Sequence, residues 1–125
     1  MHQINWGVIG PGSIARAFAY SIQGTTNSKL TSVFGRNPQK TDSFASKFQL
    51  NAHHRLSDFI SSKETDAIYI ATPHSEHFFY ALEAIKNGKH VLCEKPLTMN
   101  AYESMVLIDL ANSKNVFLME AFMYR

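Results

Sequence analysis

The fold of this chain is decided near its start, by residues 4–15, INWGVIGPGSIA. An apolar run leads directly into the pattern G-x-G-x-x-A, as at a strand-to-helix junction. Gly10 permits a tight turn out of the strand, Gly12 has no Cβ to block a close approach to the backbone, and Ala15 is small enough for a helix to pack tightly on the strand. The stretch therefore predicts a strand, a phosphate-binding loop and a helix, in that order.

The start of the predicted helix would provide hydrogen-bond donors for a phosphate group. Free N–H groups at Ser13 and Ile14 would face a pyrophosphate, with the positive end of the helix dipole behind them. The alternative is a plain structural turn, because glycine-rich turns are common. The strand before the loop and the helix after it favour a dinucleotide-binding site that includes Gly10, Gly12, Ser13 and Ile14.

Strand-like and helix-like segments alternate along the rest of the chain. The expected strands are residues 6–9, 30–34, 51–54, 67–71, 90–93 and 116–119, and the expected helices are residues 13–23, 38–48, 57–60, 75–87 and 100–112, with Asn37, Ser75 and Asn100 as N-caps. Strands separated by helices pair in parallel through right-handed crossovers. The prediction is an α/β fold with a doubly wound parallel sheet in the order 3-2-1-4-5-6, in one Rossmann-type domain over residues 1–125.

The composition is that of one globular domain. The 125 residues are 45% hydrophobic, which is enough for a core, and the chain is short for a two-domain enzyme. The net charge of +2 and the scattered Lys and Arg residues do not favour nucleic acid or a membrane surface as a partner. Cys93 is the only cysteine and is expected to be a buried hydrophobe, which suits a cytoplasmic protein. We expect no signal peptide, and no apolar stretch approaches the roughly 20 residues that span a bilayer.

The second expected strand ends without an acidic side chain. In NAD-specific folds an acid at this point, about 20 residues after the glycine loop, binds the ribose hydroxyls. Residues 34–37 are Phe-Gly-Arg-Asn, and the planar fork of Arg36 suits the oxygens of a 2′-phosphate, with Lys40 as a possible second contact. The alternative is an ordinary surface arginine at a helix start. This strand end favours NADP over NAD.

The fourth expected strand ends at Thr72 and Pro73, where a bound dinucleotide would cross the sheet. His74 and His77 follow at a spacing that places them on one helix face. A metal site needs a third ligand, and the sequence offers no obvious one. We therefore expect His77 to point toward the nicotinamide or substrate side and His74 to be a surface residue.

The fifth expected strand ends in opposite charges, Glu94 and Lys95, before Pro96. An ammonium held at this point can donate a hydrogen bond to the oxygen on the reacting carbon and stabilise a developing alkoxide during hydride transfer. Glu94 would bind ribose hydroxyls or orient the nicotinamide carboxamide. The alternative is a solvated ion pair at a strand end. Lys95 is the one catalytic residue that the sequence predicts.

These pieces occur together, in this order, in one known family. Residues 7–15, residues 71–73 with His77, residues 88–97 and residues 119–125 resemble the N-terminal domain of the glucose–fructose oxidoreductase/inositol dehydrogenase (Gfo/Idh/MocA) family. The resemblance covers essentially the whole chain. Its ending is most similar to dihydrodiol dehydrogenases and NADP-dependent xylose dehydrogenases.

The resemblance implies an oxidoreductase that uses NADP or NAD and acts by hydride transfer on a sugar, polyol or related secondary alcohol. In the family, the lysine that matches Lys95 contacts the reacting oxygen and the nicotinamide. The usual general acid/base, most of the substrate pocket and the usual dimer interface belong to a C-terminal α/β domain, so a homo-oligomer is compatible with the resemblance. This chain stops at Arg125, about where that domain should begin, and we expect the chain alone to be inactive.

The sequence also allows two functions without catalytic activity. One is a stand-alone dinucleotide-binding module, and the other is an interaction protein that uses the sheet face normally covered by the second domain. Gly35 also departs from the serine that often stands beside the arginine of NADP-binding members, which bears on the choice of cofactor. The substrate itself is not readable from this sequence.

Overall fold

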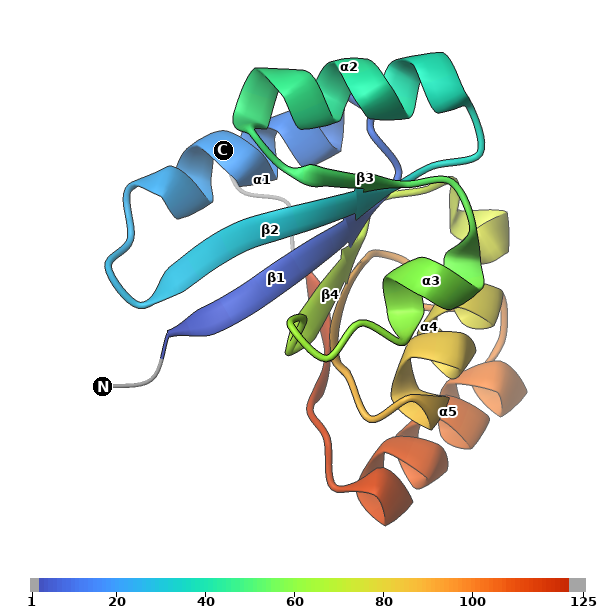
Figure 1. Ribbon diagram of the computed structural model, residues 1–125. Helices are drawn as coiled ribbons and strands as arrows, with labels where there is room; N and C mark the ends of the chain where they lie inside the picture. Colours follow the sequence, from blue (N-terminus) through green and yellow to red (C-terminus); the bar gives the residue numbers. More distant parts are fainter. Residues whose placement is uncertain (1–2, 122–125) are drawn as a thin grey trace.

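The computed structural model describes residues 3–121 of the chain (Figure 1). Six parallel strands form one sheet in the order β3-β2-β1-β4-β5-β6, which confirms the predicted doubly wound arrangement. The strands are β1 (Ile4–Ile9), β2 (Ser28–Phe34), β3 (Asn51–His53), β4 (Ala67–Ile70), β5 (His90–Glu94) and β6 (Leu118–Ala121). The helices are α1 (Ser13–Gln23), α2 (Pro38–Phe48), α3 (Leu56–Ile60), the 3₁₀ turn η1 (His74–Glu76), α4 (His77–Lys86) and α5 (Ala101–Lys114).

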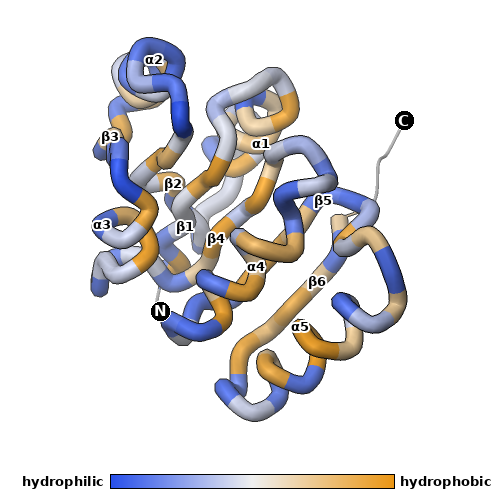
Figure 2. The backbone as a smooth tube through the Cα atoms, turned by 90° about the vertical axis from the view of Figure 1, so that its right-hand side faces the viewer, coloured by the Kyte–Doolittle hydropathy of each residue, from blue (hydrophilic) through white to orange (hydrophobic). Residues whose placement is uncertain are grey.

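Helices cover both faces of the sheet (Figure 1). α1 and α2 pack on one face, and α3, α4 and α5 pack on the other. The alternating residues of the central strands divide between two cores, so that Val8 faces α1 while Ile9 faces α4. Figure 2 shows apolar residues along β4 and α4, as expected for a buried parallel strand and a helix that packs on the sheet. None of the helices within residues 3–121 has the length and apolar character to cross a membrane.

Side-chain caps define the starts of two helices, α2 and α5. Asn37 Oδ1 accepts from the Lys40 N–H at 3.0 Å, and Asn100 Oδ1 accepts from the Glu103 N–H at 2.9 Å, which confirms both predicted caps. The predicted cap at Ser75 is wrong. Ser75 lies inside η1, where the Glu76 N–H donates to the carbonyl oxygen of Pro73, and α4 begins only at His77.

Most strand boundaries differ from the prediction by one or two residues, and the largest shifts include a late start of β6 and early starts of β1 and β2. The last strand starts at Leu118 instead of residue 116, because the Val116 N–H donates to Ala111 O and closes the end of α5. β1 starts at Ile4, two residues early, because Ile4 pairs with Ser28 and extends the ladder between β1 and β2. The shift of β6 thus comes from a local hydrogen bond at the end of α5, and the shift of β1 from pairing with a strand far along the chain.

The register of the sheet brings the site loops together. Ile9 at the end of β1 pairs with Phe34 of β2 and with Ile70 of β4. The Gly10 N–H continues the ladder to Phe34 O, and the Ala71 N–H donates to Ile9 O, each at 2.9 Å. The loops after β1, β2 and β4 therefore start level with one another at the carboxyl edge of the sheet, where ligands bind in this class of fold.

Candidate functional site

A cleft of about 340 Å³ opens where these three loops meet. It contains five of the predicted cofactor-binding residues: Gly10, Gly12, Arg36, Thr72 and Pro73. Glu76 and Tyr80 of α4 also line the cleft. Lys95 and Glu94 are not part of its lining, and they lie at the end of the next strand, β5.

The two loop glycines are required for different reasons. Gly10 has φ of 98°, and a Cβ there would lie 3.0 Å from the carbonyl oxygen of Ala71, so the turn itself requires glycine. Gly12 has φ of −103°, which any residue adopts, and a Cβ there would meet no atom of the described chain within 4 Å. The protein alone thus has no need for glycine at position 12. The open space beside Gly12 fits a cofactor pyrophosphate that approaches the backbone closely.

The N-terminus of α1 is suited to bind that pyrophosphate. The first intrahelical hydrogen bond runs from the Arg16 N–H to Gly12 O at 3.0 Å, which leaves the N–H groups of Ser13 and Ile14 without helical acceptors. Gly12 provides no side-chain cap, and the first turn of α1 carries no acidic residue. Ala15 is fully buried against the sheet, as predicted, and holds the helix close to the loop. These features fit a phosphate group at the positive end of the helix dipole.

The loop after β2 is packed against the glycine loop. A Cβ on Gly35 would lie 2.5 Å from Thr41 Oγ1 and 2.7 Å from Pro11 Cδ. Neither a serine nor an acidic side chain fits at this position without moving Pro11. The departure at Gly35 is therefore a packing requirement, and it removes one place where an acid could bind the ribose hydroxyls.

Arg36 is paired across the cleft. Its guanidinium forms an ion pair with the carboxylate of Glu76, in the turn that follows β4. The side chain is 71% exposed, so it remains accessible to a ligand while its charge is compensated. Tyr80 lies nearby, and burial followed by the Glu76 carboxylate raises the pKa of its phenol, which stays protonated.

His77 does not have the predicted orientation. The side chain is 1% exposed, with Nδ1 2.7 Å from Pro96 O and Nε2 2.8 Å from Thr72 O. Both partners are backbone carbonyl oxygens, so both ring nitrogens of His77 lie against the backbone of the two loops. His77 therefore connects the loop after β4 to the turn after β5, and it is not free to exchange a proton with a substrate.

We expect the loss of this connection to destabilise the fold. His77→Ala removes two buried hydrogen bonds and leaves a small cavity, and should lower the free energy of unfolding by about 3 kcal/mol. His74→Ala is the matched control, because that exposed histidine should change stability by less than about 0.5 kcal/mol. Urea unfolding followed by circular dichroism measures both. Equal unfolding midpoints for the two variants would show that the connection carries no stability.

The turn that carries Lys95 is held by two other elements, α4 and β6. The Lys95–Pro96 peptide is cis, and Pro96 O is bound by His77 of α4. The Leu97 N–H donates to Glu120 Oε2 of β6 at 2.7 Å. Lys95 itself is exposed and forms no ion pair with a carboxylate of residues 3–121, so this turn presents its ammonium at the carboxyl edge of the sheet.

Glu94 is buried beside this turn and accepts a hydrogen bond from the Tyr69 hydroxyl of β4. Burial, and next the hydrogen bond to Glu94, raise the pKa of Tyr69, so its phenol remains a donor. One carboxylate oxygen is thereby committed to the protein, and a contact of Glu94 with ribose or carboxamide stays a prediction. Cys93 is fully buried as predicted, and burial raises the pKa of its thiol to about 12, which makes it unreactive.

Tyr69 and Glu120 were not predicted as parts of the site. Each is an isolated polar side chain in an otherwise apolar strand, and that pattern is the only signal the sequence offers for them. Among residues 3–121, no group of three or more His, Cys, Asp or Glu side chains is placed to hold a metal ion.

Comparison with known proteins confirms the predicted family. The model of the Gfo/Idh/MocA oxidoreductase family, with its NAD-binding Rossmann fold, matches residues 4–122. The chain is 37% identical over 121 residues to scyllo-inositol 2-dehydrogenase (NADP(+)) IolU of Bacillus subtilis, and 34% identical over 123 residues to trans-1,2-dihydrobenzene-1,2-diol dehydrogenase of Xenopus tropicalis. These matches cover 94% and 96% of this chain but 36% and 37% of the relatives, so the chain spans about a third of their length.

A solved structure supports the same comparison. KijD10, a 3-ketoreductase from Actinomadura kijaniata solved with NADP and TDP-benzene, superposes with a TM-score of 0.91 at 27% sequence identity. The superposition covers 95% of this chain and 37% of that one. The structural match thus has the same extent as the sequence matches.

Proposed function

We propose that this chain, which belongs to the Gfo/Idh/MocA oxidoreductase family, is the cofactor-binding part of an enzyme that oxidises or reduces a sugar, polyol or related secondary alcohol. The observation that carries the proposal is Gly12, where the fold leaves open space beside an uncapped helix N-terminus. Neither feature serves the packing of the chain itself. Both suit a dinucleotide pyrophosphate.

The residues of this chain would have the following roles. The N–H groups of Ser13 and Ile14 hold the pyrophosphate, and Thr72 and Pro73 form the wall along which the cofactor crosses the sheet. When bound, the nicotinamide ring supplies or accepts the hydride. The Lys95 ammonium donates a hydrogen bond to the oxygen on the reacting carbon and stabilises the negative charge that develops there.

Two requirements of hydride transfer are not met by the residues that were predicted here. A proton-transfer group is needed, and His77, the one candidate, is bound to two carbonyl oxygens. A pocket that holds the alcohol near the nicotinamide is needed as well. We assign both to further parts of a longer protein, since the relatives are about three times as long as this chain. A cytoplasmic location belongs to the same proposal, in line with the single buried cysteine.

The cofactor preference is testable on the chain itself. Residues 34–37 carry no acid, Gly35 has no room for one, and Lys40 lies at the cleft, so we expect NADP⁺ to bind more tightly than NAD⁺. One charge-assisted phosphate contact corresponds to an affinity ratio of about 10 or more. Isothermal titration calorimetry with each cofactor measures the ratio. Tighter NAD⁺ binding would overturn the preference, and no binding of either cofactor would overturn the proposed function.

A further inference from the structure

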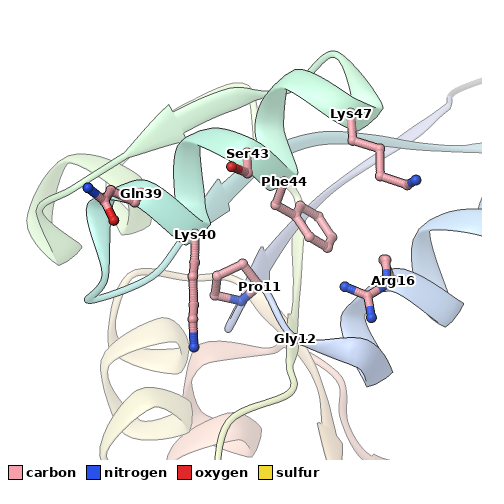
Figure 3. A pocket seen from close by; sticks show the side chains of 8 residues that line it. All are labelled: Pro11, Gly12, Arg16, Gln39, Lys40, Ser43, Phe44 and Lys47. Carbon is pink, nitrogen blue, oxygen red and sulfur yellow. The ribbon is translucent and has the colours of Figure 1, made fainter.

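The loop that carries Lys95 lies between two regular elements, after β5 and before α5. The cations beside the glycine loop, Arg16, Lys40 and Lys47, project from α1 and α2, where helix hydrogen bonds fix the backbone (Figure 3). Lys95 follows the last residue of the β5 ladder, so its backbone position depends on the bonds made by the residues after it. The nearest of these bonds converge on one peptide unit.

Both polar groups of the peptide unit between Pro96 and Leu97 are bound by side chains. His77 Nδ1 of α4 lies 2.7 Å from Pro96 O. On the opposite side of the unit, the Leu97 N–H donates to Glu120 Oε2 of β6 at 2.7 Å. A hydrogen bond to a carboxylate is stronger than one between neutral groups. The orientation of this peptide plane is therefore fixed from two elements, and the Glu120 carboxylate makes the charge-assisted contact.

Glu120 serves this loop and does not serve the sheet. The parallel register places it opposite Cys93, one residue before the end of β5, and its carboxylate extends beyond that end to Leu97. It is half-buried on the edge strand of the sheet, between apolar residues. Within residues 3–121, the Leu97 N–H is its hydrogen-bond partner, and no cation pairs with it.

The far end of the same loop is bound in a similar way. The Met99 N–H donates to Glu103 Oε1 of α5 at 3.2 Å. Glu103 is also half-buried, so the two glutamates make the same kind of contact with the backbone at opposite ends of the loop. The contact of Glu120 lies two residues from Lys95, whereas the contact of Glu103 lies four residues away. This pair of glutamates allows a matched comparison.

We propose that Glu120 is a positioning residue of the hydride-transfer reaction, which fixes the backbone from which Lys95 reaches the nicotinamide and the substrate oxygen. The inference rests on the proposed function and adds a residue to it. The β5 ladder fixes the chain before Lys95, at Glu94, and the bound peptide unit fixes it after Lys95. Without the carboxylate, one side of that unit is unbound and can turn. A displacement of about 1 Å at a reacting group can cost about 100-fold in rate.

The first test follows the Lys95 side chain by NMR in the 125-residue chain. A ¹³C-lysine label makes the lysine Cε signals visible, and Lys95→Ala identifies the Lys95 signal by its loss. Saturating NADP⁺ should shift this signal in the wild type, because the side chain then lies beside the nicotinamide ring. Glu120→Leu should reduce the shift by about half or more, with NADP⁺ affinity within about threefold of the wild type.

Two further variants separate positioning from a loss of folding. Glu120→Gln keeps an oxygen acceptor for the Leu97 N–H and should retain most of the shift. Glu103→Leu removes the matched contact at the far end of the loop and should leave the shift unchanged. Glu120→Ala repeats the test with a smaller side chain, in case leucine disturbs the edge strand, and should behave as Glu120→Leu does.

The second test is a double-variant cycle in a longer protein that carries this chain. Glu120→Leu should lower kcat by about 10- to 100-fold and change the KM for NADP⁺ by less than about threefold. In a Lys95→Ala background the same substitution should lower kcat by less than about twofold, because Glu120 acts through Lys95. Glu120→Gln should keep kcat within about threefold of the wild type.

The outcomes distinguish this inference from the proposed function. A Glu120→Leu chain with the full NADP⁺-dependent shift, or a wild type that binds NADP⁺ without any shift of Lys95, overturns the positioning role and leaves the proposed function standing. Equal losses of kcat with and without Lys95 would make Glu120 a structural residue and overturn the inference as well. A wild-type chain that binds neither NADP⁺ nor NAD⁺ overturns the proposed function itself.

Discussion

Gly12→Asp is expected to stabilise the fold while it abolishes dinucleotide binding. The backbone at Gly12 is extended, a Cβ there meets no atom within 4 Å, and α1 has no side-chain cap. Aspartate is a better N-cap than glycine, and its charge interacts favourably with the helix dipole, so stability should rise by about 0.5–1 kcal/mol. The same carboxylate would accept hydrogen bonds from the N–H groups that otherwise bind the pyrophosphate, and its charge would repel the pyrophosphate. The affinity for the dinucleotide should therefore fall by about 100-fold or more.

Two measurements on one variant check this prediction. Thermal unfolding should show a Tm higher by about 2–5 °C, and calorimetric titration with NADP⁺ should show little or no heat of binding. Gly12→Asn is the matched control, because it has nearly the same shape and no charge, and should stabilise the fold with a smaller loss of affinity. If Gly12→Asp binds NADP⁺ as the wild type does, the pyrophosphate does not lie at the start of α1.

Lys95→Ala is expected to remove most of the activity of a longer protein that carries this chain. Loss of one donor to a developing oxyanion lowers kcat by about 100- to 1000-fold. Lys95 is exposed on a turn whose backbone is bound by His77 and Glu120, so loss of the Lys95 side chain should leave the fold intact. Cofactor affinity should change by less than about threefold, since the glycine loop and α1 remain unaltered.

The measurement follows NADPH absorbance with a panel of sugars and polyols in the longer protein. Lys63→Ala serves as the control for loss of an exposed lysine and should retain full kcat. The 125-residue chain alone should show no turnover, because it lacks a free proton-transfer group among the predicted residues. Full activity of Lys95→Ala would remove this lysine from the mechanism, and robust turnover by the short chain would place the substrate pocket within it.

The fold was predictable because its signals act over a few neighbouring residues. The side-chain cap at Asn37, the turn at Gly10 and the small Ala15 each depend on local backbone geometry, and all three are confirmed. Alternation of strands and helices then leaves few ways to order a parallel sheet. The same reasoning places Lys95 at the carboxyl edge of the sheet, next to the loops that carry the glycines.

The partners of the site residues were not predictable in this way. Arg36 pairs with a carboxylate 40 residues away, Tyr69 with one 25 residues away, and the Leu97 N–H with one 23 residues away. Each pair forms only because the register of parallel strands brings separate loops to one edge. Sequence spacing carries no record of that register, so His77 was predicted to face a ligand when it in fact connects two loops.

The sequence by itself thus determined the strand–loop–helix unit, the sheet order and the family, because hydrophobic periodicity, glycine conformation and helix capping are local properties. The tertiary structure alone decided which charges are already compensated and which are free. Arg36 is paired with Glu76, whereas Arg16 and Lys40 have no carboxylate partner among residues 3–121. That distinction depends on which side chains meet across the sheet edge, and it exists only after the chain has folded.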